Sequence, residues 1–491
     1  IKLDIPYLSD EDREDIKYAC ETGGEYLAIS FVSCKEDVME IKELYSIFCQ
    51  CGCVATDSRK ISGGELFIAL KGENFDGNEY AEKALNSGAA YVVVTSGSVV
   101  CDKSSAYLDS DGLSRIIPVS DTLQTLQELA RYHREHVLPD GKHLDIIGIT
   151  GTNGKTTTKE LIKTVLSAKY NVVATEGNLN NDIGVPLSLL KITPSTELAV
   201  IEMGASHPDD IFKLVRVSEP DFGIITNVGK AHLQGFGSFE GVKKAKGCLY
   251  DYVNAFGTSV FVNADDPVLV SMTEERNCKS VISYGLHHDG CVIMDTTPEE
   301  PFLRIMMPGG VVVKTKLVGA YNSANVLAAL CIGKHFGVPE DLAISAIESY
   351  TPSNSRSQMV KTEHNVLVVD AYNANPSSMS AALNNFSGMK AAHKAALLGD
   401  MRELGPTSVS EHIAIVELAM KSGMDVICFV GEEFGKALTQ IGIVPAENSG
   451  IRWYGTSEEL ADALAKKPLH GYAILVKGSR GIMMEKAIPA L

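Results

Sequence analysis

Several features that would place this chain in a familiar class of protein are missing from its sequence. No apolar run approaches the ~20 residues of a membrane-spanning helix, and no signal peptide opens the chain. Positive charge is scarce, because 44 Lys and Arg face 62 Asp and Glu for a net charge of −18. This balance disfavours nucleic acid and anionic membranes as partners. We expect a cytoplasmic bacterial protein without membrane insertion, in which any site for an anion is locally basic.

A disulfide framework and internal repeats are also lacking. The eleven cysteines are scattered and odd in number, which favours reduced thiols. Cys49-Gln-Cys51-Gly-Cys53 could suggest a metal, but no second Cys/His pair with ligand spacing follows, so we interpret these residues as packing thiols. A chain of 491 residues that is 45% hydrophobic and without repeats predicts about three globular domains.

One stretch carries the strongest signal. The apolar run 144–149 predicts a buried strand, a glycine-punctuated turn follows, and a helix is expected from Thr156 onward. Strand, glycine loop and helix form the context of a phosphate-binding loop, in which backbone N–H groups surround phosphate oxygens and Lys155 supplies charge. The hydroxyl of Thr156 or Thr157 would bind Mg²⁺. The match to the pattern G-x-x-x-x-G-K-[ST] of such loops is imperfect, because Ile149 stands where the first glycine should be. The alternative interpretation is a helix N-terminus that carries Gly-Lys-Thr without binding phosphate.

Polar residues follow three further apolar strands of the central segment. Glu202 follows 198–201, Thr226 and Asn227 follow 222–225, and Asn263 and Asp265 follow 260–262. Ligands of open α/β sheets bind outside the carboxyl ends of the strands. Glu202 is therefore the natural carboxylate for a nucleotide's Mg²⁺, and a solvated strand-end acid is the alternative.

The segment from Pro352 repeats the arrangement without a G-x-G-x-x-G loop, since its strands end at Asp370, Asp400, Gly431 and Lys477. The whole chain thus predicts an α/β protein with three domains. These are a small N-terminal α/β domain (39–138), a central P-loop doubly wound domain (139–351) and a C-terminal Rossmann-like domain (352–491).

An ordered set of motifs resembles the Mur ligase family from about Met39 to Leu491. The motifs are Thr150-Gly-Thr-Asn-Gly-Lys-Thr-Thr157, Gly177-Asn-Leu-Asn-Asn-Asp-Ile-Gly-Val-Pro186, Glu202-Met-Gly-Ala205, Thr226-Asn-Val-Gly-Lys-Ala-His-Leu233, Gly319-Ala-Tyr-Asn-Ser-Ala-Asn325 and Asp370-Ala-Tyr-Asn-Ala-Asn-Pro376. The last motif is similar to the corresponding motif of the family members that add D-alanyl-D-alanine. The Asp-Asn-Pro-Arg signature of the members that add diaminopimelate or lysine is absent from this sequence.

The resemblance implies an ATP-dependent, ADP-forming ligase of peptidoglycan synthesis. Its partners would be UDP-N-acetylmuramoyl-tripeptide and D-Ala-D-Ala, joined through an acyl phosphate with the help of ATP and two Mg²⁺ ions. Another amino-acid ligase of the same superfamily and a P-loop switch without ligation are the alternatives, and the absence of an Asn-Lys-x-Asp base reader speaks against a GTP switch. We expect a monomer.

The resemblance also implies roles for particular residues. The expected catalytic residues are Lys155, Glu202, His232 and Lys246. Expected metal ligands are Thr156, Glu202, His232 and Lys246. Lys246 would be a ligand as a carbamate, and a plain salt-bridged lysine is the alternative. Expected ATP contacts are Gly151, Thr152, Asn153, Gly154, Lys155, Thr156, Thr157, Asn181 (or Asn180), Asn322, Asn325, Arg356 and Asp370. Expected contacts to the other substrates are Ser58, Arg59, Asp76, Tyr372, Asn373, Lys477 and Arg480.

Residues 1–38 do not share the resemblance. Their pattern, from Ile5 to Val38, is similar to a helix–strand segment of the pyruvate kinase family's barrel, without that family's substrate lysine or metal carboxylates. We interpret them as an extraneous N-terminal segment without kinase activity.

Overall fold

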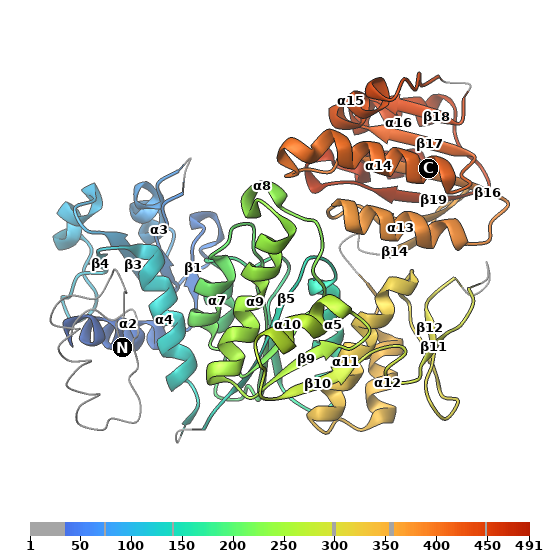
Figure 1. Ribbon diagram of the computed structural model, residues 1–491. Helices are drawn as coiled ribbons and strands as arrows, with labels where there is room; N and C mark the ends of the chain where they lie inside the picture. The colour runs from blue at the N-terminus through green and yellow to red at the C-terminus, as the bar shows by residue number, and fades with distance from the viewer. Residues whose placement is uncertain (1–34, 73–74, 140–141, 297–300, 353–357, 447–448) are drawn as a thin grey trace. The chain divides into compact units, whose positions relative to one another are not determined.

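The structure is a computed structural model that describes residues 35–72, 75–139, 142–296, 301–352, 358–446 and 449–491 (Figure 1). The chain forms two compact units. One comprises Ile1–His143 with Pro186–Pro194, and the other comprises Leu144–Val185 with Ser195–Leu491. None of the helices in the described ranges combines the length and hydropathy that a membrane crossing requires.

The first unit contains a parallel sheet whose strands follow chain order, β1-β2-β3-β4. Phe67 and Val92 of this sheet pack against Ala81 and Ala84 of a short helix. The elements are β1 (Val54–Ala55), β2 (Leu66–Ile68), β3 (Tyr91–Thr95), β4 (Ile116–Val119), α2 (Lys35–Cys51), α3 (Ala81–Asn86) and α4 (Thr122–His136). Helix α2 packs on α4, where the rings of Tyr45 and Tyr132 lie 5.0 Å apart.

Two observations in this unit bear on what the sequence led us to expect. Helix α2 begins at Lys35, so it runs across the predicted boundary at Met39. The boundaries 39–138, 139–351 and 352–491 stay predictions, and the resemblance of 1–34 to pyruvate kinase falls outside the described residues. The interpretation of the Cys49–Cys53 cluster as packing thiols is wrong for Cys49 and Cys53, whose side chains are exposed near the end of α2.

The second unit contains the central sheet, in the order β10-β9-β8-β5-β7-β6, with all pairs parallel. Its strands are β5 (Asp145–Thr150), β6 (Val172–Ala174), β7 (Leu198–Glu202), β8 (Phe222–Ile225), β9 (Ser259–Asn263) and β10 (Val281–Tyr284). Apolar side chains make β7 and β8 buried throughout, as expected for parallel strands covered on both faces. The parallel pairing brings Thr150, Glu202 and Ile225 to one edge.

The helices of the central sheet form two groups, α5 with α11 and α12, and α7 with α9. A small antiparallel sheet, β11-β12-β13, precedes α11 in the chain. The elements are α5 (Lys155–Leu166), α6 (Gly184–Leu189), α7 (Asp210–Ser218), α8 (Leu233–Phe236), α9 (Phe239–Phe256), α10 (Pro267–Glu275), β11 (Val292–Ile293), β12 (Arg304–Met306), β13 (Val312–Lys314), α11 (Ser323–His335) and α12 (Glu340–Ser349).

The C-terminal sheet has the order β14-β15-β19-β16-β17-β18, and only the β14 pair is antiparallel. Alternate residues of β15 enter different cores, Val368 on one face and Leu367 with Val369 on the other, so helices cover both faces. The elements are β14 (Gln358–Lys361), β15 (Val366–Asp370), α13 (Pro376–Gly388), β16 (His393–Gly399), α14 (Ser408–Lys421), β17 (Val426–Val430), α15 (Glu432–Gln440), β18 (Ile451–Tyr454), α16 (Ser457–Lys466) and β19 (Tyr472–Lys477). The predicted α/β class is confirmed.

Candidate active site

The loop between β5 and α5 has the conformation of a phosphate-binding loop. Gly151 (φ 147°) and Gly154 (φ 80°) adopt left-handed backbone angles that side chains disfavour. A Cβ on Gly151 would lie 1.9 Å from Thr226 Oγ1. Asn227 accepts from Thr152 N through its carbonyl (3.0 Å) and from Asn153 N through its side chain (3.0 Å). The predicted strand-end pair Thr226-Asn227 thus holds the loop in shape.

Two lysines converge on this loop. Lys155 Nζ donates to Gly151 O (2.7 Å) and Thr152 O (3.1 Å), and Lys246 Nζ from α9 donates to the same Gly151 carbonyl (3.0 Å). Burial lowers the pKa of Lys246 well below its ordinary value, and the nearby Lys155 cation lowers it further. Lys155 therefore supplies a cation at this loop in a chain whose net charge is −18, in agreement with the expectation that an anion site is locally basic.

Glu202 lies beside the loop at the end of β7 and is 1% exposed. Its Oε1 accepts from Thr156 Oγ1 (3.0 Å) and Asn180 Nδ2 (2.9 Å). Its Oε2 is buried and accepts no hydrogen bond from any described residue. A buried carboxylate oxygen without a donor, next to a threonine hydroxyl, is the oxygen-rich environment that Mg²⁺ prefers, so these residues fit that ion.

His232 occupies a left-handed backbone position (φ 50°) in the loop after β8 and is half-buried. Its Nδ1 pairs with the carboxylate of Glu403. Burial lowers the pKa of His232, and the cations of Lys155 and Lys246 lower it further, while Glu403 opposes them. Nothing in the sequence pattern singled out Glu403, which lies far along the chain.

These side chains border a cavity of about 700 Å³. The predicted site residues that line it are Thr152, Asn153, Gly154, Lys155, Thr156, Thr157, Asn181, Glu202, His232, Asn322, Asn325, Asp370, Tyr372, Asn373 and Lys477. Lys246 lies beneath the loop, and Arg356 lies outside the described residues. The loop also contacts the C-terminal segment, since Asn375 Nδ2 donates to Asn153 Oδ1 (2.8 Å).

The predicted asparagines all have protein partners. Asn325 accepts from Thr158 Oγ1 (3.0 Å) and donates to Asn322 Oδ1 (2.9 Å), so this pair braces the start of α5. Asn181 accepts from Gly184 N (2.9 Å) at the start of α6, whereas Asn180 bonds Glu202. Their contacts to ATP stay predictions.

The structure distinguishes the predicted dipeptide contacts, which the sequence left unranked. Lys477 is 1% exposed and donates to Asp370 Oδ2 (2.5 Å) on the neighbouring strand, so it is committed to an ion pair. Asn373 and Arg480 are exposed, and the Arg480 guanidinium lies 5.6 Å from the centre of the half-buried Tyr372 ring.

A second cavity, of about 870 Å³, lies at the carboxyl ends of β16, β17 and β18. Its charged lining residues are Asp400, Arg402, Glu403, Glu432, Glu433 and Glu458. Asp400 accepts from Glu433 N (3.0 Å) and Phe434 N (2.9 Å), and burial raises its pKa. Sequence reasoning noted the strand ends at Asp400 and Gly431 but did not predict this cavity.

Comparison with known proteins identifies the group to which this fold and site belong. Three family models match: the Mur ligase family catalytic domain over residues 51–134, the Mur ligase middle domain over 149–333 and the Mur ligase glutamate ligase domain over 355–480. The UDP-N-acetylmuramoyl-tripeptide–D-alanyl-D-alanine ligase of Escherichia coli is 33% identical over 89% of this chain and 93% of its own. The Bacillus subtilis enzyme of the same name is 32% identical over 89% and 92%.

The chain belongs to the Mur ligase family.

Solved structures of Mur ligases agree with this assignment. MurF from Acinetobacter baumannii has a TM-score of 0.74 at 27% identity, covering 89% of this chain and 92% of its own. MurF ligase from Thermotoga maritima, in complex with ADP, has a TM-score of 0.74 at 26% identity, covering 89% and 96%.

The first unit of this Mur ligase contains the residues expected at the uridine nucleotide. Asp57 accepts from Arg59 N (3.0 Å) and Arg59 Nε (2.9 Å), and these bonds lower the pKa of Asp57 to about 2. Ser58 begins the short helical turn that Asp57 caps, and Asp76 caps a similar turn through Asn78 N (2.9 Å). The contact of Ser58, Arg59 and Asp76 with substrate stays a prediction.

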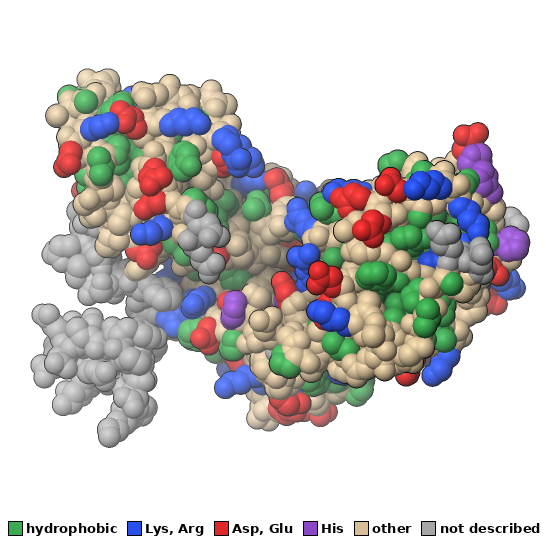
Figure 2. Space-filling view, turned by 90° about the horizontal axis from the view of Figure 1, so that it is seen from above, with side chains coloured by type: hydrophobic (Ala, Val, Ile, Leu, Met, Phe, Trp, Pro, Cys, Tyr) green, Lys and Arg blue, Asp and Glu red, His purple; other side chains and the backbone are tan. Residues whose placement is uncertain are grey.

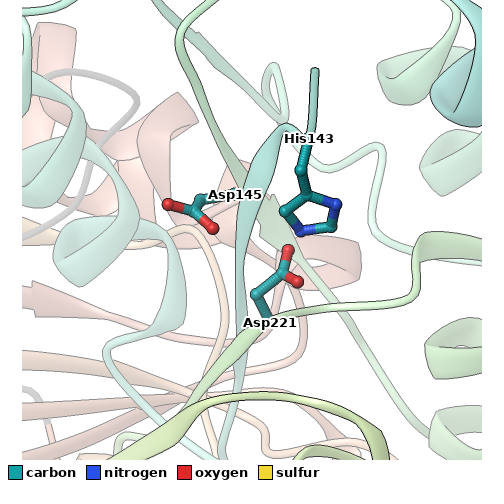
Figure 3. A group of neighbouring side chains, drawn as sticks. All are labelled: His143, Asp145 and Asp221. Atoms are coloured by element: carbon teal, nitrogen blue, oxygen red, sulfur yellow. The ribbon is translucent and has the colours of Figure 1, made fainter. Parts of the chain in front are cut away.

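Outside the candidate site, Figure 3 shows Asp145 and Asp221 with His143. Asp145 opens β5 and Asp221 precedes β8, so both acids belong to the amino edge of the central sheet, opposite the phosphate loop. Asp221 already accepts from Ile146 N (2.8 Å). On the face in Figure 2, acidic and basic side chains are intermixed, so the net negative charge is not gathered there in one patch.

Proposed function

We propose that this chain is an ATP-dependent, ADP-forming ligase that joins D-Ala-D-Ala to UDP-N-acetylmuramoyl-tripeptide, giving the pentapeptide precursor of peptidoglycan. The observation that carries the proposal is the glycine loop with Lys155 and Glu202 at one cavity and Lys246 beneath the loop. The similarity of this chain to the E. coli ligase, over nearly the whole length of both chains, supports the choice of substrates.

The chemistry needs activation because a carboxylate is a poor electrophile. The terminal carboxylate oxygen of the tripeptide attacks the γ-phosphorus of ATP, an acyl phosphate forms, and the bond to ADP breaks. The amine of D-Ala-D-Ala then attacks the acyl carbon, loses its proton, and the tetrahedral intermediate expels inorganic phosphate. Negative charge gathers between carboxylate and γ-phosphate in the first step, which is where preorganised cations are most effective.

The loop and its lysines perform this task. Backbone N–H groups at the start of α5 would face the phosphates, because Gly154 at the N-cap position has no side chain to cap them. Lys155 lies within reach of phosphate oxygens that would replace the carbonyls of Gly151 and Thr152 as its acceptors. Loss of one such group typically costs about 10²–10³ in rate.

Mg²⁺ would be held by Thr156 and Glu202, with His232 as a further ligand. The ion would neutralise charge on the transferred phosphoryl group. Glu403 pairs with Nδ1 of His232, so Nε2 is the nitrogen left for a ligand role. Asn373, Tyr372 and Arg480 are the accessible groups at which the resemblance would place the dipeptide. The second cavity, beside Arg402, is the alternative place for it.

A phosphate-release assay tests the proposal. We expect release of phosphate and ADP only when ATP, UDP-N-acetylmuramoyl-tripeptide and D-Ala-D-Ala are all present. Tripeptides ending in diaminopimelate and in lysine, assayed in parallel, identify the third residue. Release that needs a single amino acid instead of the dipeptide would indicate another ligase of the superfamily, and release from ATP alone would indicate a switch or simple ATPase.

A further inference from the structure

A second buried cation, Lys159, lies behind the candidate site. It follows the glycine loop by one turn of α5 and its side chain is 0% exposed. Its Nζ donates to the carbonyl of Thr175 (2.5 Å) and pairs with Glu160 Oε1 (2.9 Å). Lysine is almost never fully buried unless it is paired. Neither the glycine-loop pattern nor the proposed chemistry accounts for a cation at this position.

Lys159 is close to the oxygen that makes Glu202 fit a metal ion. Its Nζ lies 3.8 Å from Glu202 Oε2, which is beyond hydrogen-bond range but within the range of an ion pair. Two of the three ammonium protons are directed to the acceptors named above, so Lys159 acts on this carboxylate through its charge and not through a hydrogen bond. Thr175 connects the two residues a second time, because its Oγ1 accepts from Glu202 N (3.0 Å).

The two oxygens of Glu202 therefore have different surroundings. Oε1 is fixed by hydrogen bonds from Thr156 and Asn180, whereas Oε2 makes no hydrogen bond to a described residue and lies 3.8 Å from the ammonium of Lys159. A buried carboxylate needs a compensating charge, and a compensating cation that does not itself bond Oε2 leaves that oxygen open. Lys163, one turn further along α5, is half-buried and has no such relation to Glu202, so burial of a lysine is no general property of this helix.

We propose that Lys159 is a positioning residue that holds Glu202 by charge, so that Oε2 stays oriented for a divalent cation bound with the nucleotide. The inference deepens the proposed function and rests on its nucleotide site, but it does not depend on which amine is ligated. Partners behind metal ligands typically contribute 10–100-fold to metal affinity or activity.

Direct binding of Mn²⁺ in the presence of ADP, followed by electron paramagnetic resonance of the free ion, tests this proposal without turnover. We expect Lys159→Met to weaken Mn²⁺ binding 10–100-fold, Lys159→Arg to retain most of it, and the matched control Lys163→Met to stay within twofold of wild type. Wild-type affinity in a folded Lys159→Met variant would overturn the proposal. Absence of Mn²⁺–ADP binding to the wild-type chain would instead overturn the nucleotide site itself.

A double-substitution cycle separates positioning from a purely structural role. If Lys159 acts through Glu202, Lys159→Met should have no further effect on Mn²⁺ binding in a Glu202→Gln background. If Lys159→Met alone fails to fold, Lys159→Met/Glu202→Gln should recover a cooperative unfolding transition, because the uncompensated charge is gone. Failure of the double variant to fold, or equal effects of Lys159→Met in both backgrounds, would show that Lys159 merely ties α5 to Thr175.

Discussion

The carboxyl edges of the central and C-terminal sheets differ in what meets the first turns of their helices. At the central edge, the residue before α5 is Gly154, which has no side chain to cap the first N–H groups of the helix. At the C-terminal edge, Asn375 caps α13 in a reciprocal box with Ser378, and Asp400 accepts from two N–H groups of α15. Two parallel sheets thus end differently: glycine leaves helix N–H groups for a phosphate, whereas Asn and Asp satisfy them internally.

The charged side chains at the two sheet edges also differ. Lys155 and Lys246 converge on the glycine loop, but the second cavity is lined mainly by acids, with Arg402 among them. An anionic nucleotide therefore suits the first edge, and a zwitterionic dipeptide, with an ammonium and a carboxylate, suits the second. Glu403 connects them, since it lines the second cavity and pairs with His232 of the first.

The largest expected effect comes from removing the phosphate-facing charge at the central edge. Lys155→Ala should reduce ligation about 10³-fold, at the upper end of the effect of one preorganised group. Its Nζ bonds loop carbonyls and is no part of a hydrophobic core, so the unfolding temperature should stay near that of wild type. Turnover near the wild-type rate in a folded variant would contradict the phosphate-loop assignment.

Lys246→Ala should have the next largest effect, a loss of about 10² in rate. Burial lowers the pKa of Lys246, which favours the neutral amine that reacts with CO₂, and a carbamate would turn the cation into an oxygen ligand. We therefore expect a short carboxylate added to the assay to restore part of the activity. Full activity of Lys246→Arg, with an unmodified mass for the wild-type peptide under bicarbonate, would exclude the carbamate.

Arg402→Ala tests whether the dipeptide uses the C-terminal edge. We expect KM for D-Ala-D-Ala to rise about tenfold, as for one lost charge-assisted hydrogen bond, while KM for ATP stays unchanged. Arg480→Ala is the paired variant, because the sequence placed Arg480 at the dipeptide. A rise in the dipeptide KM for Arg480→Ala alone would place the dipeptide beside Arg480 and Tyr372 instead.

The candidate site was predictable where local pattern determines geometry. Parallel strands share a carboxyl edge, so the positions of Glu202, Thr226 and Asp370 followed from apolar runs and the polar residues after them. The long-range contacts around the candidate site were not predictable. The Glu403 pair with His232 and the Asn375 bond to Asn153 join residues far apart in the chain, and no periodicity encodes such contacts.

Residue type alone also misled the sequence analysis at Cys49 and Cys53. Cysteine is usually buried, but these residues lie near the end of α2 and their side chains are exposed. Lys159 was overlooked for the converse reason, since lysine on a helix usually faces water and only tertiary structure reveals its burial.

The smallest expected effect concerns His412, which supports the C-terminal edge from within. Its side chain is 0% exposed, its Nδ1 lies 2.7 Å from Ser408 O, and its Nε2 accepts from Met401 N (3.0 Å). Both nitrogens are thus engaged by the neutral ring, and burial lowers the pKa of His412. Below pH ~6.5 the unfolded chain gains a proton that the folded ring resists, so stability is lost as the pH falls from ~6.5 toward the folded pKa. The slope from one proton is at most about 1.4 kcal/mol per pH unit.

Urea unfolding between pH 7 and 5 should show a smaller loss of unfolding free energy in His412→Gln than in wild type, whereas the variant of the exposed His393, His393→Gln, should behave as wild type. Parallel pH profiles for wild type and His412→Gln would mean that the ring accepts its proton without opening the turn at Met401.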